Sequence, residues 1–120
     1  MLIFVYGTLK RNEYNHHIIE RKASFLMNVM SVEKYPMVIL NDPFPYLIDK
    51  VGTGKQIKGE LYDIDIRHLE DLDYFEGVPT LYKRGEILVR FDDMVTSTIT
   101  YFKADEIKLD DLTLIDKYEG

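Results

Sequence analysis

The feature that most constrains the fold is one short helical pattern with strand-forming segments on both sides of it. In residues 66–75 the apolar side chains recur at every third position: Ile66, Leu69, Leu72 and Phe75. Asp65 suits the N-cap, because its carboxylate can accept hydrogen bonds from the free amides of the first turn. Gly77 and Pro79 end the helix. The pattern predicts a helix over 66–75 with its apolar stripe buried.

Segments rich in β-branched and aromatic residues occupy much of the remaining chain. They predict strands at residues 3–6, 24–32, 37–40, 57–64, 82–91 and 96–103. Asp92 and Asp93 are expected to form the hairpin turn between the last two. The two prolines in residues 41–45 predict a turn, since proline fixes φ and lacks an amide donor. Gly59, inside a strand, indicates the close approach of another backbone.

A second short helix is expected at residues 13–21, with Asn12 as its cap, whereas residues 109–120 show no clear pattern. Helices and strands do not alternate regularly, which argues against a doubly wound sheet. The chain has 120 residues and no repeat or linker. We therefore expect a single α+β domain, residues 1–120, in which a small mixed β-barrel is flanked by short helices.

Composition narrows the range of partners. The formal net charge of −6 argues against a nucleic-acid surface, which needs a basic footprint. There are no cysteines, so a disulfide framework or thiolate metal site is excluded. The apolar run that opens the chain ends at Gly7, too short for a signal sequence or a membrane span. We expect a cytoplasmic protein with no metal, nucleic-acid or membrane partner.

The first candidate site is the loop Tyr6-Gly7-Thr8-Leu9. Gly7 is expected to allow a positive φ and the close approach of a ligand. Successive amides in such a turn can form an anion-binding nest. Spacing alone leaves open an ordinary turn between a strand and a helix.

The second candidate is Glu76, the acid at the end of the predicted helix. The negative end of the helix dipole and the apolar neighbours Phe75, Val78 and Tyr82 are expected to raise its pKa. A carboxyl with a raised pKa suits proton transfer near neutral pH. The alternative is an exposed acid at a helix end, in a chain with 21 acidic residues.

Several motifs occur in an order that resembles one family. They lie at residues 5–11, 15–16, 35–39, 45–47, 52–54, 59–65, 72–84 and 116–120. Together they resemble the γ-glutamylcyclotransferase superfamily and, within it, the AIG2-like γ-glutamylaminecyclotransferase branch. Asn12 and Tyr14 depart from the pattern, because the branch tends to have glycine and proline there.

This resemblance implies a reaction without cofactor, in which the α-amine of a small γ-glutamyl substrate attacks its own γ-amide. The products are 5-oxoproline and a free amine. The resemblance implies that Glu76 is the catalytic acid–base. It implies further that the substrate is held by Tyr6, Gly7, Thr8, Leu9 and Tyr82.

Three weaker candidates and three alternative functions remain. Tyr82 either hydrogen-bonds Glu76 or fills the core, Arg84 is expected to pair with an acid, and Tyr118 to cap the cleft. The alternatives are a cyclotransferase for another γ-glutamyl amino acid, one for an acyl-protected biosynthetic intermediate, and a non-catalytic module that binds a small anion. The oligomeric state is left open.

Overall fold

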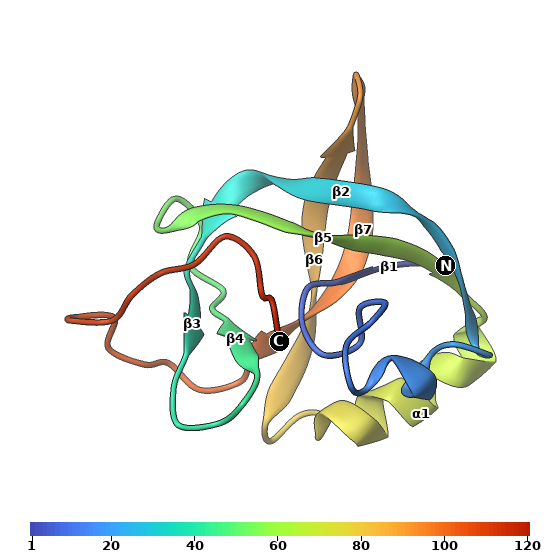
Figure 1. Ribbon diagram of the computed structural model, residues 1–120, viewed down its shortest axis with the longest axis horizontal. Helices are drawn as coiled ribbons and strands as arrows, with labels where there is room; N and C mark the ends of the chain where they lie inside the picture. Colours follow the sequence, from blue (N-terminus) through green and yellow to red (C-terminus); the bar gives the residue numbers. More distant parts are fainter.

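The computed structural model describes residues 1–120 as a closed five-stranded barrel with one α-helix against it (Figure 1). The barrel strands are β1 (Leu2–Val5), β2 (Ala23–Tyr35), β5 (Lys55–Ile64), β6 (Tyr82–Phe91) and β7 (Met94–Lys103). The other elements are η1 (His16–Ile18), β3 (Met37–Ile39), β4 (Pro45–Leu47) and α1 (Ile66–Glu76). The expected α+β fold with a small mixed barrel is confirmed.

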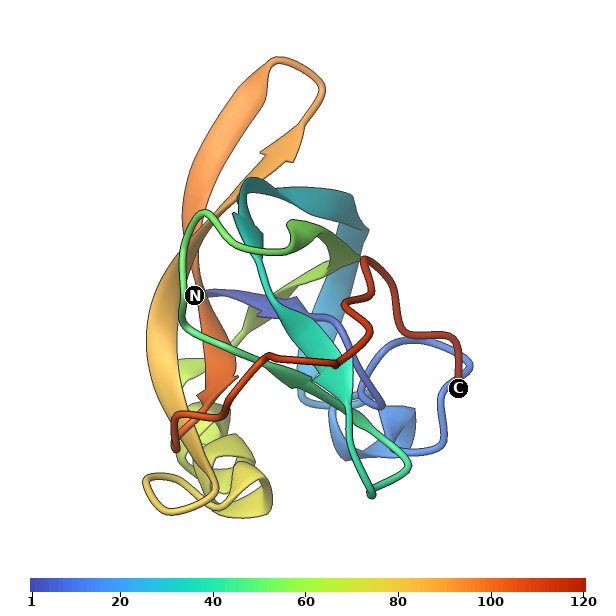
Figure 2. The same cartoon turned by 90° about the vertical axis from the view of Figure 1, so that its left-hand side faces the viewer.

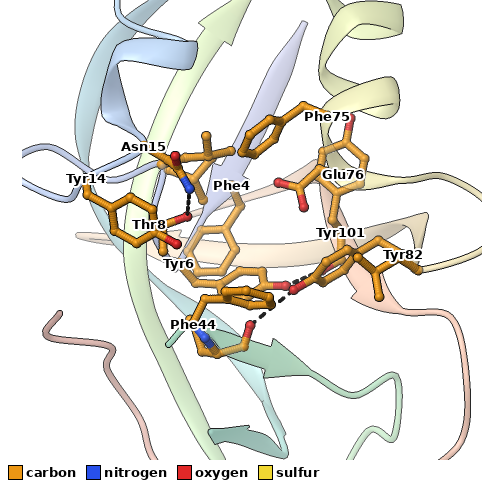
Figure 3. A pocket seen from close by; sticks show the side chains of 15 residues that line it. Phe4, Tyr6, Thr8, Tyr14, Asn15, Phe44, Phe75, Glu76, Tyr82 and Tyr101 are labelled. Carbon is orange, nitrogen blue, oxygen red and sulfur yellow. Dashed lines mark hydrogen bonds between the residues drawn. The ribbon is translucent and has the colours of Figure 1, made fainter. Parts of the chain in front are cut away.

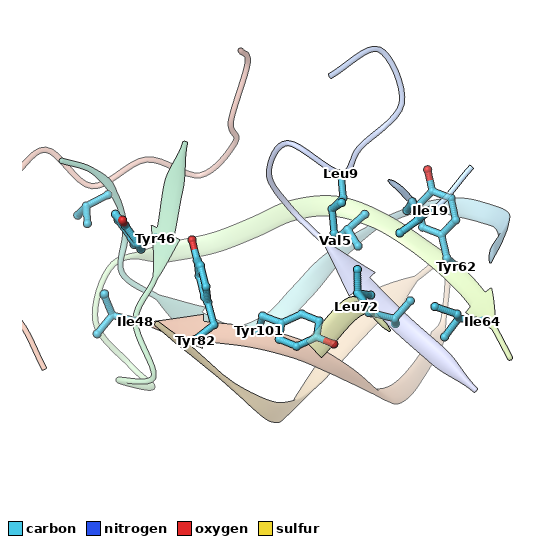
Figure 4. Packing of buried hydrophobic residues seen from close by; sticks show 12 residues of the cluster. Val5, Leu9, Ile19, Tyr46, Ile48, Tyr62, Ile64, Leu72, Tyr82 and Tyr101 are labelled. Atoms are coloured by element: carbon cyan, nitrogen blue, oxygen red, sulfur yellow. The ribbon is translucent and has the colours of Figure 1, made fainter. Parts of the chain in front are cut away.

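The barrel closes because β1 pairs on both of its edges. It runs antiparallel to β5 and parallel to β7, in the strand order β1-β5-β2-β6-β7. Only Ile3 and Ile99 pair across the parallel junction. Apolar side chains of the barrel, of β3–β4 and of α1 fill the interior (Figure 4). β1, at the centre of this arrangement, leads directly into the loop at residues 6–9.

Gly59 lies where β5 crosses closely over β1, as its position in a predicted strand indicated. A Cβ atom on Gly59 would overlap the carbonyl oxygen of Val5 and the ring of Phe4. Only glycine allows the two strands to approach this closely.

The predicted helix is present, although its apolar stripe is only partly buried. The Asp65 carboxylate accepts from the amide of Arg67 at 2.9 Å, which confirms the N-cap. Leu69 and Leu72 are buried, but Ile66 is 65% exposed and Phe75 39% exposed. At 3.6 residues per turn, positions nine apart lie on opposite sides of a helix, so a strict spacing of three cannot keep all four side chains on one face.

The α-helix expected at residues 13–21 is wrong, because this segment forms only turns and the three-residue η1. Asn12 caps nothing and has a φ of 70°. The Asn15 side-chain amide donates to Thr8 Oγ1 at 3.1 Å, and His16 Nδ1 lies 2.9 Å from the Leu9 carbonyl oxygen. These contacts hold the segment against the loop at residues 6–9 instead of letting it continue as a helix.

The last residues cross over the β3–β4 sheet without regular structure and return toward the N-terminal loop (Figure 2). The Ile115 amide donates to the Met37 carbonyl at 2.9 Å, and the Lys58 amide donates to the Asp116 carbonyl at 2.8 Å. The tail is therefore tied to both sheets. None of the helices has the length and hydrophobicity needed to pass through a membrane.

The close crossing of β5 and β1 predicts that Gly59→Ala destabilises the fold. The added methyl group would force the strands apart at a cost of about 1–3 kcal/mol. Urea denaturation measures this, with the exposed substitution Gln56→Ala on the same strand as control, for which the change should stay within about 0.5 kcal/mol. A Gly59→Ala variant as stable as the control would contradict the packing described here.

Candidate active site

A cavity of about 180 Å³ opens where the end of β1, the end of α1 and the starts of β4 and β6 meet. Its lining comes from residues 4–9, 14–15, 44–45, 75–76 and 81–82 and from Tyr101. Most of these side chains are apolar or aromatic, and Glu76 is the only one with a charge (Figure 3). The two places singled out in the sequence thus line one cavity.

Glu76 is the last residue of α1, and its carboxylate points into the cavity (Figure 3). The burial of Leu69 and Leu72 anchors the helix, and Gly77, with a φ of 68°, turns the chain away after Glu76. The Glu76 side chain is half-buried, and no hydrogen bond within the protein stabilises its charged form. Burial raises the pKa of this carboxyl to about 7. Near neutral pH it can therefore both take up and release a proton.

The loop at residues 6–9 lines the cavity, and three of its amides bind nothing else in the chain. Lys10 N donates to the Gly7 carbonyl at 3.1 Å and Asn15 N to the Thr8 carbonyl at 3.1 Å. No hydrogen bond uses the amide of Gly7, Thr8 or Leu9 as donor. Three successive amides therefore remain free to bind an anion or a polarised carbonyl oxygen.

Gly7 does not adopt the positive φ that glycine permits, since the glycines with positive φ are Gly52, Gly54 and Gly77. Gly7 instead provides room. A Cβ atom on it would lie 3.1 Å from Cγ of Pro45, which lines the same cavity. The small side chain keeps the loop close to the start of β4.

Tyr6 and Tyr82 form part of the cavity wall, and both hydroxyls donate to backbone carbonyls. The Tyr6 hydroxyl donates to Tyr101, and the Tyr82 hydroxyl donates to Pro45 at 3.3 Å (Figure 3). Of the two options for Tyr82, the hydrogen bond to Glu76 is absent. Burial raises the pKa of both phenols, so they stay neutral beside the carboxyl.

The sequence analysis missed Tyr101 and Asp73, which support the cavity from behind. The Tyr101 hydroxyl donates to Asp73 Oδ1 at 2.6 Å, and Arg84 Nε contacts the same oxygen at 3.1 Å. The expected pairing of Arg84 with an acid is thereby confirmed. Asp73 lies three residues before Glu76, on the same side of the helix, and this spacing is the signal that was available.

The remaining candidates lie elsewhere. Tyr118 is buried, donates to the Pro43 carbonyl at 3.0 Å and does not line this cavity, so the expectation that it caps the cleft is wrong. His17 Nδ1 lies 3.1 Å from the Tyr14 carbonyl oxygen. No cluster of three or more histidine, aspartate or glutamate side chains is arranged to hold a metal ion.

Comparison with known proteins identifies one matching family and several similar relatives. The model of the family described as "Gamma-glutamyl cyclotransferase, AIG2-like" matches residues 3–119. Gamma-glutamylaminecyclotransferase A of Danio rerio is 40% identical over 93 residues, which cover 73% of this chain and 58% of the relative. The Homo sapiens gamma-glutamylaminecyclotransferase is 39% identical over 94 residues, covering 74% and 61%.

The chain thus spans about three fifths of the length of these curated relatives. The crystal structure of an aig2-like protein from Mus musculus superposes with a TM-score of 0.89 at 30% identity. That superposition covers 98% of this chain and 87% of the mouse chain.

The raised pKa of Glu76 predicts how stability depends on pH. Between the ordinary value of 4.5 and about 7 the folded state holds a proton that the unfolded state has lost, so stability falls as pH rises through this window. Glu76→Gln removes the cost of ionisation. Its free energy of unfolding should exceed that of the wild type by up to roughly 3 kcal/mol at pH 8 and match it near pH 4.

Urea denaturation at the two pH values measures this difference. The control is Glu70→Gln, an exposed acid on the same helix. If the free energies of unfolding of Glu76→Gln and Glu70→Gln depend on pH in the same way, burial does not raise the pKa of the Glu76 carboxyl.

Proposed function

The chain belongs to the AIG2-like gamma-glutamyl cyclotransferase family, and from this we propose that it cleaves γ-glutamylamines to 5-oxoproline and a free amine. One observation carries the proposal: a carboxyl with a pKa of about 7 lines the same small cavity as three successive unpaired amides. This cyclisation requires a group that carries protons. It also requires donors that bind either the substrate's α-carboxylate or the carbonyl oxygen that becomes negative during attack.

The proposed reaction needs neither water nor an electron carrier. Glu76 takes a proton from the substrate's α-ammonium, and the freed amine attacks the γ-carbonyl carbon. A carbon–nitrogen bond forms in a five-membered ring, and the bond from that carbon to the leaving nitrogen then breaks. Glu76 passes this proton to the leaving nitrogen and then relays to it the second proton that the ring nitrogen must lose, so that the amine leaves as an ammonium ion. Since nucleophile and electrophile belong to one molecule, correct orientation supplies several kcal/mol of the barrier.

The loop amides supply the other half of the proposed site. The cavity has no lysine, arginine or histidine in its lining, so an anionic group of the substrate would be bound by neutral donors. We assign the amides of Gly7, Thr8 and Leu9 to the α-carboxylate or to the oxygen that becomes negative during attack. Losing one such donor typically costs about 3 kcal/mol of transition-state stabilisation. Tyr6 and Tyr82 then act as neutral walls that hold the glutamyl chain.

The lining also favours γ-glutamylamines over γ-glutamyl amino acids. An amino-acid leaving group brings a second carboxylate, for which the cavity offers no cation and places Glu76 nearby. Tyr14 and Leu81 line the cavity and are 58% and 43% exposed, so they offer apolar surface at its opening. An uncharged alkyl chain is the better fit to that surface.

We further propose that residues 1–120 act as one catalytic domain in the cytoplasm. The absence of cysteine suits a reducing compartment, and the net charge of −6 disfavours nucleic acid. Because no group is oxidised or reduced and no water is consumed, the proposed chemistry requires no cofactor.

The proposal predicts release of 5-oxoproline from a γ-glutamyl alkylamide and its loss in Glu76→Gln. Removing a group that transfers protons in the transition state should lower kcat by about 10²–10⁴-fold. A panel of γ-glutamyl-butylamide, γ-glutamyl-alanine and a γ-glutamyl amide whose leaving amine is part of an acylated compound, each with a free α-amine, makes the measurement with 5-oxoproline as readout. Glu70→Gln serves as the control and should keep wild-type activity.

The panel also separates the alternatives. Faster turnover of γ-glutamyl-alanine than of the alkylamide would assign the enzyme to γ-glutamyl amino acids, and turnover of the acylated compound alone would assign it to a protected intermediate. Saturable binding of glutamate without turnover of any compound would identify a non-catalytic module. Full activity of Glu76→Gln would contradict the mechanism.

A further inference from the structure

A second, larger cavity lies on the other side of the N-terminal loop from the candidate active site. Its volume is about 790 Å³, and its lining comes from residues 10–13, 28–30, 58–60 and 117–120 and from Arg90. It therefore lies between the turn after the loop, the paired strands β2 and β5, and the C-terminal tail. Unlike the first cavity, it is lined mainly by polar and charged side chains.

Basic side chains outnumber acidic ones in this lining, five to three, although the whole chain carries a net charge of −6. Three of the five basic side chains are already in ion pairs. Arg11 pairs with Glu60 at 3.3 Å and Lys117 with Glu119 at 3.3 Å, both within the lining, and Lys58 pairs with Asp116 at 3.4 Å. Lys10 and Arg90 are therefore the basic side chains of the lining that have no ion pair.

Lys10 is the most unusual member of the lining. Its side chain is buried, with 6% of the residue exposed, and its ammonium donates to the Tyr118 carbonyl at 2.6 Å. It takes part in no ion pair, whereas Arg11, Lys58 and Lys117 each do. A buried ammonium is costly unless it is paired and hydrogen-bonded, and burial here lowers the pKa of Lys10. One carbonyl satisfies only one of its three donors.

The lining also reaches the loop that faces the active site. Lys10 follows Leu9 directly, and the Glu13 amide donates to the Lys10 carbonyl at 3.1 Å. A ligand held by Lys10 would restrain the turn at residues 10–13, and with it the position of the free amides at residues 7–9.

We propose that this cavity binds a small anion carrying phosphate or carboxylate groups, with Lys10 as its central cation and Arg90 and Lys117 at its opening. Such groups accept charge-assisted hydrogen bonds from lysine and arginine, and they would complete the coordination of the Lys10 ammonium. The volume fits a small metabolite better than a single inorganic ion. Binding here involves neither Glu76 nor the first cavity, so it stands or fails independently of the cyclotransferase activity.

The test is titration calorimetry with two compact polyanions, inorganic pyrophosphate and citrate, at constant ionic strength so that general screening does not vary. We expect saturable binding of at least one probe, and which probe binds more tightly identifies phosphate or carboxylate as the preferred group. Lys10→Met keeps most of the apolar stem and removes the charge, and it should weaken binding at least tenfold. Lys22→Met, whose exposed lysine pairs with Asp71 at 3.4 Å away from this cavity, should bind as the wild type does.

Arg90→Gln provides a second variant, because Arg90 is exposed and its replacement does not touch the core. It should weaken binding several-fold, and it decides the question if Lys10→Met fails to fold. Absence of saturable binding to the wild-type chain, or equal affinity of wild type, Lys10→Met and Arg90→Gln, would overturn the proposal.

Discussion

The half-burial of the Glu76 carboxyl is the constraint on which the proposed chemistry depends. A glutamate at a helix end is ordinarily solvated and ionised well below pH 7. Here Leu69 and Leu72 seat α1 on the barrel, and the cavity wall keeps water from much of the carboxyl. The resulting pKa of about 7 lets one group serve as base and then as acid. The same burial lowers the free energy of unfolding at neutral pH, because the carboxyl ionises less easily in the folded state than in the unfolded state.

The barrel brings this carboxyl and the loop amides to opposite walls of one cavity. β1 carries the loop and is fixed between β5 and β7, while α1 follows β5 directly in the chain. Behind the cavity, Asp73 of α1 holds Tyr101 of β7, and the Tyr101 carbonyl accepts from Tyr6 at the start of the loop. Both walls are thus linked through β7. A substitution of Asp73, Tyr101 or Tyr6 should therefore shift the position of Glu76 or of the loop amides.

Much of the architecture follows from local patterns. The five barrel strands, the Asp65 cap, the Asp92–Asp93 turn and the close approach at Gly59 all leave signals within a few residues of sequence, whereas β4 begins at Pro45, which was expected in a turn. The wrong predictions fall on segments whose conformation is set by contacts with residues outside the segment. The Asn12 segment has helix-start residues, yet Asn15 and His16 bind the loop instead. Tyr118 resembles a cap for the cleft, but the path of the tail takes it to Pro43.

At the candidate site, no single position distinguished a functional role from a structural one. The order of the motifs along the chain indicated the family. Glu76 and the loop at residues 6–9 each had an ordinary structural explanation, and no spacing rule brings them together across some 70 residues. Only the fold places them around one cavity. The spacing of three residues from Glu76 was a signal for Asp73, whereas nothing local indicated Tyr101, whose role depends on a contact with Asp73, 28 residues away in the chain.

The most direct test of the central claim is the pH dependence of kcat/KM for 5-oxoproline release from a γ-glutamyl alkylamide. This quantity reports the ionisation of the essential groups in the free enzyme. If Glu76 is the base, kcat/KM should fall about tenfold per pH unit below a midpoint near 7, and that midpoint should coincide with the pKa of Glu76 measured by NMR. A profile that stays flat from pH 8 down to pH 5 would contradict the account.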